Sequence, residues 1–248
     1  KLYVRDMRCL RCAPLTDLTS WTPLPLPHPD IWWWSALTTY HSQLVLVGGW
    51  GGGKALNEVW VSADGTNWQQ SLPPMPTYHC GAVAVNTGSP ECLVVASDDS
   101  VDVLVQGKWT SLQCPLKVWG GTTHNGNLYL HDEKCVWYCQ VESLLAACTQ
   151  TGAVRETALW KEMSPPGGYI RALVSFGQQL LAVFDDGKCS AFSPLTQSWV
   201  HVADTVDTGP VHTALPISPG ELLVASYEGL YKVTLRGKPA VAICITLS

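Results

Sequence analysis

The sequence of 248 residues carries little charge, and its balance is unsuited to one large class of proteins. Asp, Glu, Lys and Arg make up 14% of the chain, and 20 acidic residues against 15 basic ones give a net charge of −5. Proteins that bind nucleic acids by neutralising phosphates need the opposite balance. We therefore expect no nucleic-acid partner.

The sequence also lacks long hydrophobic runs and the marks of secretion. No stretch reaches the roughly eighteen consecutive apolar residues that a transmembrane helix needs. The first residues have no apolar centre of the kind found in signal peptides, and no Asn-x-Ser/Thr glycosylation acceptor occurs. We expect no membrane partner and predict a reducing, cytoplasmic setting. The ten cysteines are then interpreted as small buried hydrophobes rather than a disulfide framework.

Motifs for catalysis and metal binding are scarce as well. The G-x-S-x-G elbow of many hydrolases does not occur. Cys9 and Cys12 have no second pair at zinc-ribbon spacing, and they fall in a predicted strand, where residues three apart face opposite sides. The run 48–54 (GGWGGGK) is similar to a phosphate-binding loop, but Ala55 replaces the required Ser or Thr and a strand follows instead of a helix. We predict a flexible loop there, and no catalytic residue, metal or cofactor.

Tryptophan, by contrast, is abundant: twelve residues against three phenylalanines. Five of them recur in one local context, at spacings of 47, 41, 51 and 39 residues: Trp21, Trp68, Trp109, Trp160 and Trp199. After each comes an apolar or β-branched run, a tight turn, a second apolar run and a third short run. Four short strands in a period of about 40 to 50 residues predict an all-β fold, a β-propeller of four-stranded antiparallel blades.

The repeats occupy nearly the whole chain, so we predict a single domain over residues 1–248. The expected units are a partial blade at 1–28 and blades at about 29–75, 76–115, 116–165, 166–206 and 207–248. This makes six blades, the first lacking its innermost strand. We interpret residues 240–247 (AVAICITL) as the outer strand of the last blade. In the alternative, that run supplies the missing innermost strand of the first blade and closes the ring.

One repeat carries a specific pattern. It has an apolar run ending at Gly48-Gly49, then Trp60, then Trp68 followed by LPPMP, and in this it resembles the Kelch repeat. The other repeats replace the double glycine with Ser97-Asp98, His131-Asp132, Phe184-Asp185 and Ser226-Tyr227. The resemblance implies a binding propeller with no universal catalytic residue. It also implies a place in a larger multidomain chain beside an adaptor, signalling or ubiquitin-ligase domain.

Two sets of loops open on the same face of such a propeller. The leading loops, which run into the innermost strands, contain Trp33, Trp34, His79, Trp119, Arg171 and His212, as well as Trp32. The middle loops, between second and third strands, contain Trp50, Asp98, Asp99, Asp132 and Asp185. Exposed aromatic residues are typical of protein-binding hot spots, and an acidic ring attracts basic segments. We therefore predict a non-enzymatic protein-interaction module that recruits a protein or peptide, perhaps a basic one, through this face.

Two plainer interpretations remain open. Aspartates are ordinary turn residues, and the Trp32–Trp34 run can serve packing. A different function class is also open: an enzyme or small-ligand binder that uses the central channel, as galactose oxidase does with copper held by Tyr and His. For the repeated tryptophans we expect a structural role, and for Trp68→Ala a cost of about 3–5 kcal/mol.

Overall fold

The computed structural model describes residues 1–5, 9–28, 33–81, 83–149, 159–204, 210–235 and 241–245. Within these ranges the chain is mostly β-strand with one α-helix, which confirms the all-β prediction. The strands form six antiparallel sheets of three or four strands, each built from consecutive segments of the chain, and one additional two-stranded hairpin. This is the organisation expected where each sheet is one sequence repeat.

The first three sheets have three strands each. The first sheet contains β1 (Leu2–Arg5), β2 (Leu10–Ala13) and β3 (Thr22–Leu24). The second contains β4 (Ala36–Tyr40), β5 (Gln43–Val47) and β8 (Val59–Ser62), with the hairpin β6 (Trp50–Gly51) and β7 (Lys54–Ala55) in the loop after β5. The third contains β9 (Val83–Asn86), β10 (Leu93–Val105) and β11 (Lys108–Val118).

The last three sheets have four strands each. The fourth contains β12 (Gly120–His124), β13 (Asn127–His131), β14 (Val136–Gln140) and β15 (Lys161–Glu162), with the helix α1 (Val141–Thr149) after β14. The fifth contains β16 (Ile170–Phe176), β17 (Gln179–Phe184), β18 (Lys188–Ser193) and β19 (Ser198–Asp204). The sixth contains β20 (Val211–Ser218), β21 (Glu221–Ser226), β22 (Leu230–Thr234) and β23 (Val241–Ile245).

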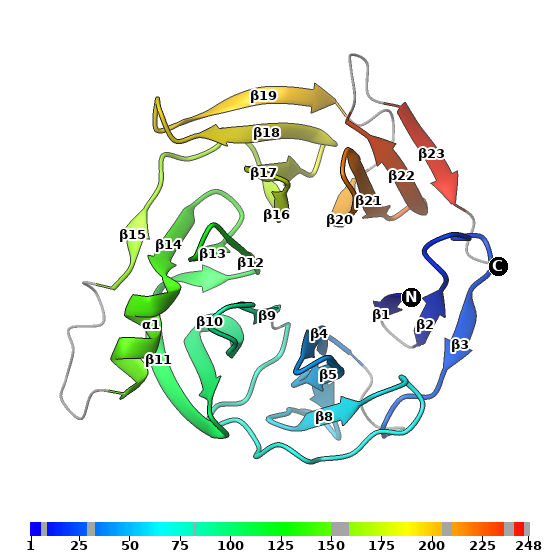
Figure 1. Cartoon of the computed structure of the whole chain (residues 1–248), viewed down its shortest axis with the longest axis vertical. Helices are drawn as coiled ribbons and strands as arrows, with labels where there is room; N and C mark the ends of the chain where they lie inside the picture. Colours follow the sequence, from blue (N-terminus) through cyan, green and yellow to red (C-terminus); the bar gives the residue numbers. More distant parts are fainter. Residues whose placement is uncertain are drawn as a thin grey trace.

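The six sheets lie around a common centre, with the first strands of the second to sixth sheets nearest to it (Figure 1). Those first strands are β4, β9, β12, β16 and β20, and each contacts the next in this order. The apolar cores lie between neighbouring sheets. One core joins the fifth and sixth sheets, and its members include Val183 of β17 and Val224 of β21. Strands covered on both sides explain the continuous apolar runs in the sequence.

The first sheet packs on the last. Leu2 of β1 and Trp21 share a buried cluster with Leu223 of β21 and Leu230 of β22. In this cluster β1 therefore lies against the second and third strands of the sixth sheet. The run at the C-terminal end supplies the outer strand of that sheet, because β23 pairs antiparallel with β22. The alternative, in which this run is the inner strand of the first sheet, is wrong for Val241–Ile245.

The five recurring tryptophans connect successive repeats. Trp21 bonds within its own segment, to the Leu18 carbonyl at 2.7 Å. The indole N–H groups of Trp68, Trp109, Trp160 and Trp199 donate to the backbone carbonyls of Pro25, Pro73, Gln113 and Ser164, at 3.1, 2.8, 3.0 and 2.8 Å. Each of these four acceptors lies four or five residues after the tryptophan of the preceding repeat. The repeated residue therefore links its own unit to the one before.

The burial of these tryptophans is uneven. Trp160 and Trp21 are buried, at 4% and 8% exposure, whereas Trp68 is only half-buried. The expectation that Trp68→Ala removes a fully buried side chain is therefore wrong, and its cost should fall below the range predicted from the sequence. Trp160 is the residue to which that range applies.

Three departures from four regular strands have local causes. The outer segment of the second sheet makes a single bridge, Val61 to Gln69, instead of a strand. In the third sheet, β10 covers both the second and the third predicted strands, with a bulge between Asp98 and Ser100. In the fourth repeat, α1 is inserted after β14, which explains the longest tryptophan spacing of 51 residues. The sequence analysis did not predict this helix.

Candidate binding face

Backbone hydrogen bonds connect the leading and middle loops at one end of the sheets. The N–H of Trp50 donates to the carbonyl of Trp33, and the N–H of Gly49 donates to that of His79, both at 2.8 Å. Corresponding bonds run from Ile170 to Glu133 and from Val211 to Asp185, at 2.7 and 3.0 Å. Each middle loop of these sheets thus contacts a leading loop, so the two sets lie on one face. We call it the loop face.

The double glycine of the best-matching repeat serves this contact. A Cβ atom on Gly48 would lie 2.6 Å from the carbonyl oxygen of His79, and one on Gly49 would lie 2.9 Å from that of Trp33. Both glycines have positive φ, at 58° and 101°. Only residues without a side chain fit here without displacing the backbone of neighbouring loops.

Exposed aromatic side chains gather on the loop face. Among the large apolar residues that are exposed in the described part, seven are aromatic, and all seven belong to leading or middle loops: Trp33, Trp34, Trp50, Tyr78, Trp119, Tyr169 and Tyr227. The remaining exposed apolar residues are the aliphatic Leu15, Leu195, Val200 and Leu215. The predicted Trp33, Trp34, Trp50 and Trp119 are therefore on the surface. Trp32 lies outside the described residues.

Three of these tryptophans form one corner. Trp33 and Trp34 meet edge to face, with ring centroids 5.6 Å apart, and Trp50 pairs with Trp33 through the backbone. The segment expected to be a flexible loop is instead the hairpin β6–β7, which turns at Gly52-Gly53 with both φ values positive. Trp34 is 51% exposed and itself has a positive φ of 57°. The hairpin thus presents Trp50 from an ordered element.

The prediction for His79 is wrong, because its side chain is completely buried. Its Nε2 lies 3.1 Å from the carboxylate of Asp102, which is also completely buried, and its Nδ1 lies 2.7 Å from the hydroxyl of Ser97. The hydroxyls of Thr77 and Ser111 donate to the same carboxylate at 2.5 and 2.6 Å. Burial raises the pKa of Asp102, but the hydrogen bonds from its neighbours outweigh it and hold the pKa below its usual value.

This network contains the serine–histidine–aspartate connectivity of a catalytic triad. Its serine, Ser97, is only 3% exposed, and no described cavity is lined by it. A nucleophile must reach its substrate, so the geometry serves structure instead. The network satisfies polar groups buried between the loop before β9 and the strands β10 and β11, and this holds the leading loop of the third sheet in place.

The predicted acidic residues have mixed surroundings. Asp98 and Asp99 are exposed, and Asp98 lies 3.6 Å from Lys117. One carboxylate oxygen of Asp132 accepts the backbone N–H groups of Lys134 and Cys135 at 2.7 and 2.6 Å. For Asp132 the plainer interpretation as a turn residue therefore holds. Asp185 is half-buried, and its backbone joins the fifth and sixth sheets.

A cavity of about 320 Å³ lies at the centre of the loop face. It is lined by residues of the second to sixth sheets, among them the predicted residues Trp119, Arg171 and His212. Small side chains of the inner strands form much of its wall, including Ala36, Ala84, Ala172 and Ala214. Arg171 is the one formally charged residue among the described residues that line it. The structure thus gathers three candidates that lie far apart in the sequence.

His131 also lines this cavity and was not predicted. It is 1% exposed, and its Nδ1 lies 2.7 Å from the carbonyl oxygen of Asp132. A carbonyl only accepts, so Nδ1 carries the proton and Nε2 is left with a lone pair. Among the described residues no hydrogen-bond partner reaches that Nε2. Burial lowers the pKa of His131 to about 4, so the ring is uncharged at neutral pH.

Glycine makes room for this histidine. Gly120 is the cross-strand partner of His131, and a Cβ atom at Gly120 would lie 2.2 Å from Nε2. The sequence signal was the dipeptide Gly120-Gly121 facing the position where other repeats have Ser or Phe. The histidine had been interpreted only as a departure from the double glycine.

The other polar residues of the cavity lie nearer its mouth. The ring of His212 contacts that of Tyr227, with centroids 3.8 Å apart, and burial together with Arg171 lowers the pKa of His212. The Nε of Arg171 is buried and has no hydrogen-bond partner in the described part of the chain. No ion pair of Arg171 is found there either. The cavity therefore offers one positive group, one bare acceptor and apolar walls.

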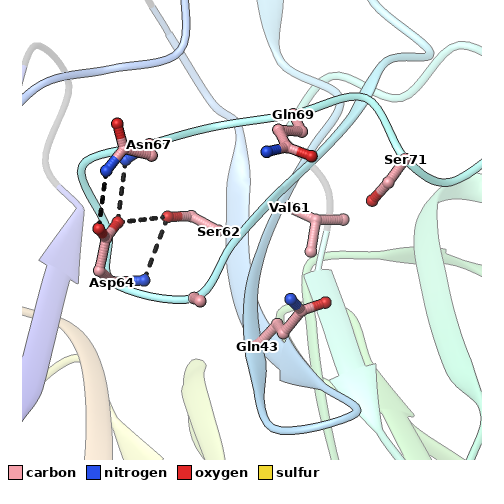
Figure 2. A pocket seen from close by; sticks show the side chains of 8 residues that line it. Gln43, Val61, Ser62, Asp64, Asn67, Gln69 and Ser71 are labelled. Atoms are coloured by element: carbon pink, nitrogen blue, oxygen red, sulfur yellow. Dashed lines mark hydrogen bonds between the residues drawn. The ribbon is translucent and has the colours of Figure 1, made fainter.

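A second, smaller pocket of about 150 Å³ lies at the second sheet, around the turn after β8 (Figure 2). Its main charged group is Asp64, whose carboxylate accepts the backbone N–H groups of Thr66 and Asn67 and bonds the hydroxyl of Ser62. These bonds hold the pKa of Asp64 well below its usual value. The carboxylate is engaged in shaping its own turn, so this pocket is a weaker candidate than the central cavity.

Three further observations bear on the predicted chemistry. None of the nine described cysteines forms a disulfide, and five of them are buried: Cys12, Cys92, Cys114, Cys139 and Cys189. In the described ranges no three His, Cys, Asp or Glu side chains are grouped so that they hold a metal ion. The helix of the described part is not long and apolar enough to span a bilayer.

Comparison of the sequence with models of protein families gives no match, and comparison with curated proteins gives none.

Proposed function

We propose that the chain is a Kelch-like β-propeller of six blades, the first without its innermost strand, and that it is a non-enzymatic protein-interaction module. Six sheets around one centre support the blade count (Figure 1). The packing of β1 against the second and third strands of the last sheet supports the missing inner strand. The five cysteines buried without disulfides fit a reducing, cytoplasmic compartment.

The clustering of exposed aromatics carries the functional proposal. A propeller's other surfaces here expose aliphatic residues only, while the loop face collects all seven exposed aromatics of the described part. Tyr and Trp are enriched at binding hot spots because each contributes a large contact area at a small cost in conformational entropy. The loop face is therefore the surface through which we propose that a protein or peptide is recruited.

The experiment is proximity labelling with the wild-type chain and with Trp34→Ala plus Tyr78→Ala, two exposed loop-face residues. The matched control is Leu195→Ala plus Val200→Ala, since Leu195 lies at the β18–β19 turn and is 96% exposed. We expect the loop-face pair to lose its labelled partners at unchanged melting temperature, and the control pair to keep them. Equal partner sets for the two double variants would overturn the assignment of the loop face.

A second candidate function, small-ligand binding in the central channel, is favoured by one observation. The central cavity has an unpartnered acceptor, His131 Nε2, beside a cation, Arg171. It is compatible with the first proposal, because the cavity opens at the same face.

A further inference from the structure

We propose that the central cavity is a binding site for a carboxylate that carries a neighbouring N–H or O–H donor, with Arg171 binding the carboxylate and Nε2 of His131 accepting from the donor. The inference deepens the proposed function and rests on it for the location of the partner. It does not depend on which protein that partner is.

The charge of the cavity selects an anion. Arg171 is the one formally charged residue among the described residues of the wall, and no carboxylate is among them. Its buried Nε has no partner in the described chain, and an unpaired buried donor of this kind is costly until a ligand satisfies it. His212 adds a second polar group at the mouth, and its lowered pKa keeps it neutral, so it donates or accepts without competing for the charge.

The second requirement comes from His131. Its Nδ1 donates to the carbonyl of Asp132, so its Nε2 accepts only. A simple anion without hydrogen would leave this acceptor unsatisfied and would bring two electron-rich groups together. A ligand with a donor beside its carboxylate matches both groups at once.

The walls limit the size of the ligand. Alanines from four different inner strands face the cavity, and Gly120 and Gly121 leave space beside His131. A volume of about 320 Å³ is at the lower end of small-molecule sites. These features suit a short aliphatic acid or the last residue of a peptide, which has a carboxylate and its own N–H. Both sources share the chemistry proposed here.

The primary probe is N-acetylalanine, titrated into the purified chain while the indole ¹⁵N–¹H signal of Trp119 and the ¹⁵N shift of His131 Nε2 are followed by NMR. We expect saturable binding with a Kd on the order of millimolar. N-acetylalaninamide, which lacks the carboxylate, and N-acetyl-N-methylalanine, which lacks the donor, should each bind at least tenfold more weakly.

Two variants assign the groups. Arg171→Gln should weaken N-acetylalanine about tenfold or more, whereas Lys108→Gln, which removes a charge from the β10–β11 turn outside the cavity, should not. His131→Asn keeps a donor toward Asp132 but loses Nε2. In this variant the difference between N-acetylalanine and its N-methyl form should disappear, a result that a merely structural role for His131 would not give.

A peptide arm identifies the source. An acetylated trialanine with a free C-terminus that binds at least as tightly as N-acetylalanine indicates a chain end, and binding by the small acid alone indicates a free metabolite. Absence of binding by both probes, or binding that amidation does not weaken, would overturn the proposal. Trp34→Ala plus Tyr78→Ala should keep acid binding, so failure at the cavity and failure of the loop-face proposal give different results.

Discussion

The outer edge and the centre of the molecule are built from the same repeats but use polar groups differently. At the outer edge, indole N–H groups find backbone carbonyls of the preceding repeat, and four of the five tryptophans do so with nearly the same offset in sequence. At the centre, Arg171 and His131 come from different sheets, and each has a buried nitrogen without a partner in the described chain. Satisfied groups stabilise a fold, whereas groups left unsatisfied mark the place where a ligand binds.

The largest effect should come from the edge. Trp160 is 4% exposed and packs in the core between the third and fourth sheets, so Trp160→Ala should lower the free energy of unfolding by about 3–5 kcal/mol. Urea denaturation followed by circular dichroism measures this. Trp160→Phe, which keeps most of the apolar contact, should lose about 1 kcal/mol through the bond to Gln113. Equal losses for the two variants would mean that packing is not the main contribution.

The network at His79 lies between edge and centre and should behave as structure. His79→Leu leaves the buried carboxylate of Asp102 without one of its donors, so we expect a loss of about 3 kcal/mol in unfolding free energy. His79→Leu combined with Asp102→Leu should recover part of that loss, because no charge is then left uncompensated. A folded single variant with wild-type stability would place His79 in the class of surface residues that the sequence predicted.

The centre should show itself in the pH dependence of stability. The pKa of His131 is about 4 in the folded chain and 6.5 without burial. As pH falls, the unfolded chain takes up the proton first, so the stability is fully present above about pH 6.5 and is lost toward pH 4. The loss due to this group is about 3 kcal/mol. Denaturation of wild type and His131→Asn at several pH values should give curves whose difference is confined to this window, and parallel curves would contradict the burial of a neutral ring.

The smallest effect should be at the exposed end of the edge. Trp68 is half-buried and bonds the carbonyl of Pro25 at the surface, so Trp68→Phe should cost about 0.5–1 kcal/mol. Thermal denaturation beside Trp160→Phe provides the comparison. If Trp68→Phe proved the more damaging of the two, the ranking of the tryptophans by burial would fail.

Local patterns predicted the edge better than the centre. The tryptophan spacing anticipated the sequence of sheets, and the apolar runs anticipated β5, β13, β17 and β21. Local patterns missed α1, whose residues 141–149 follow a strand without a break in the sequence. They also placed His79 on the surface, because a leading loop was assumed to be exposed throughout. Its burial depends on Asp102 and Ser97, which fold onto it from another strand.

The sequence by itself determined the all-β architecture, the order of the repeats and the positions of the linking tryptophans, because these depend on contacts with a regular spacing along the chain. The tertiary structure alone decided which loop residues face solvent and which are buried. It also brought Trp119, Arg171, His131 and His212 to one cavity, although they lie on three different sheets and up to 93 residues apart. The physical reason is that burial and the satisfaction of polar groups depend on neighbours from other sheets, which no local pattern contains.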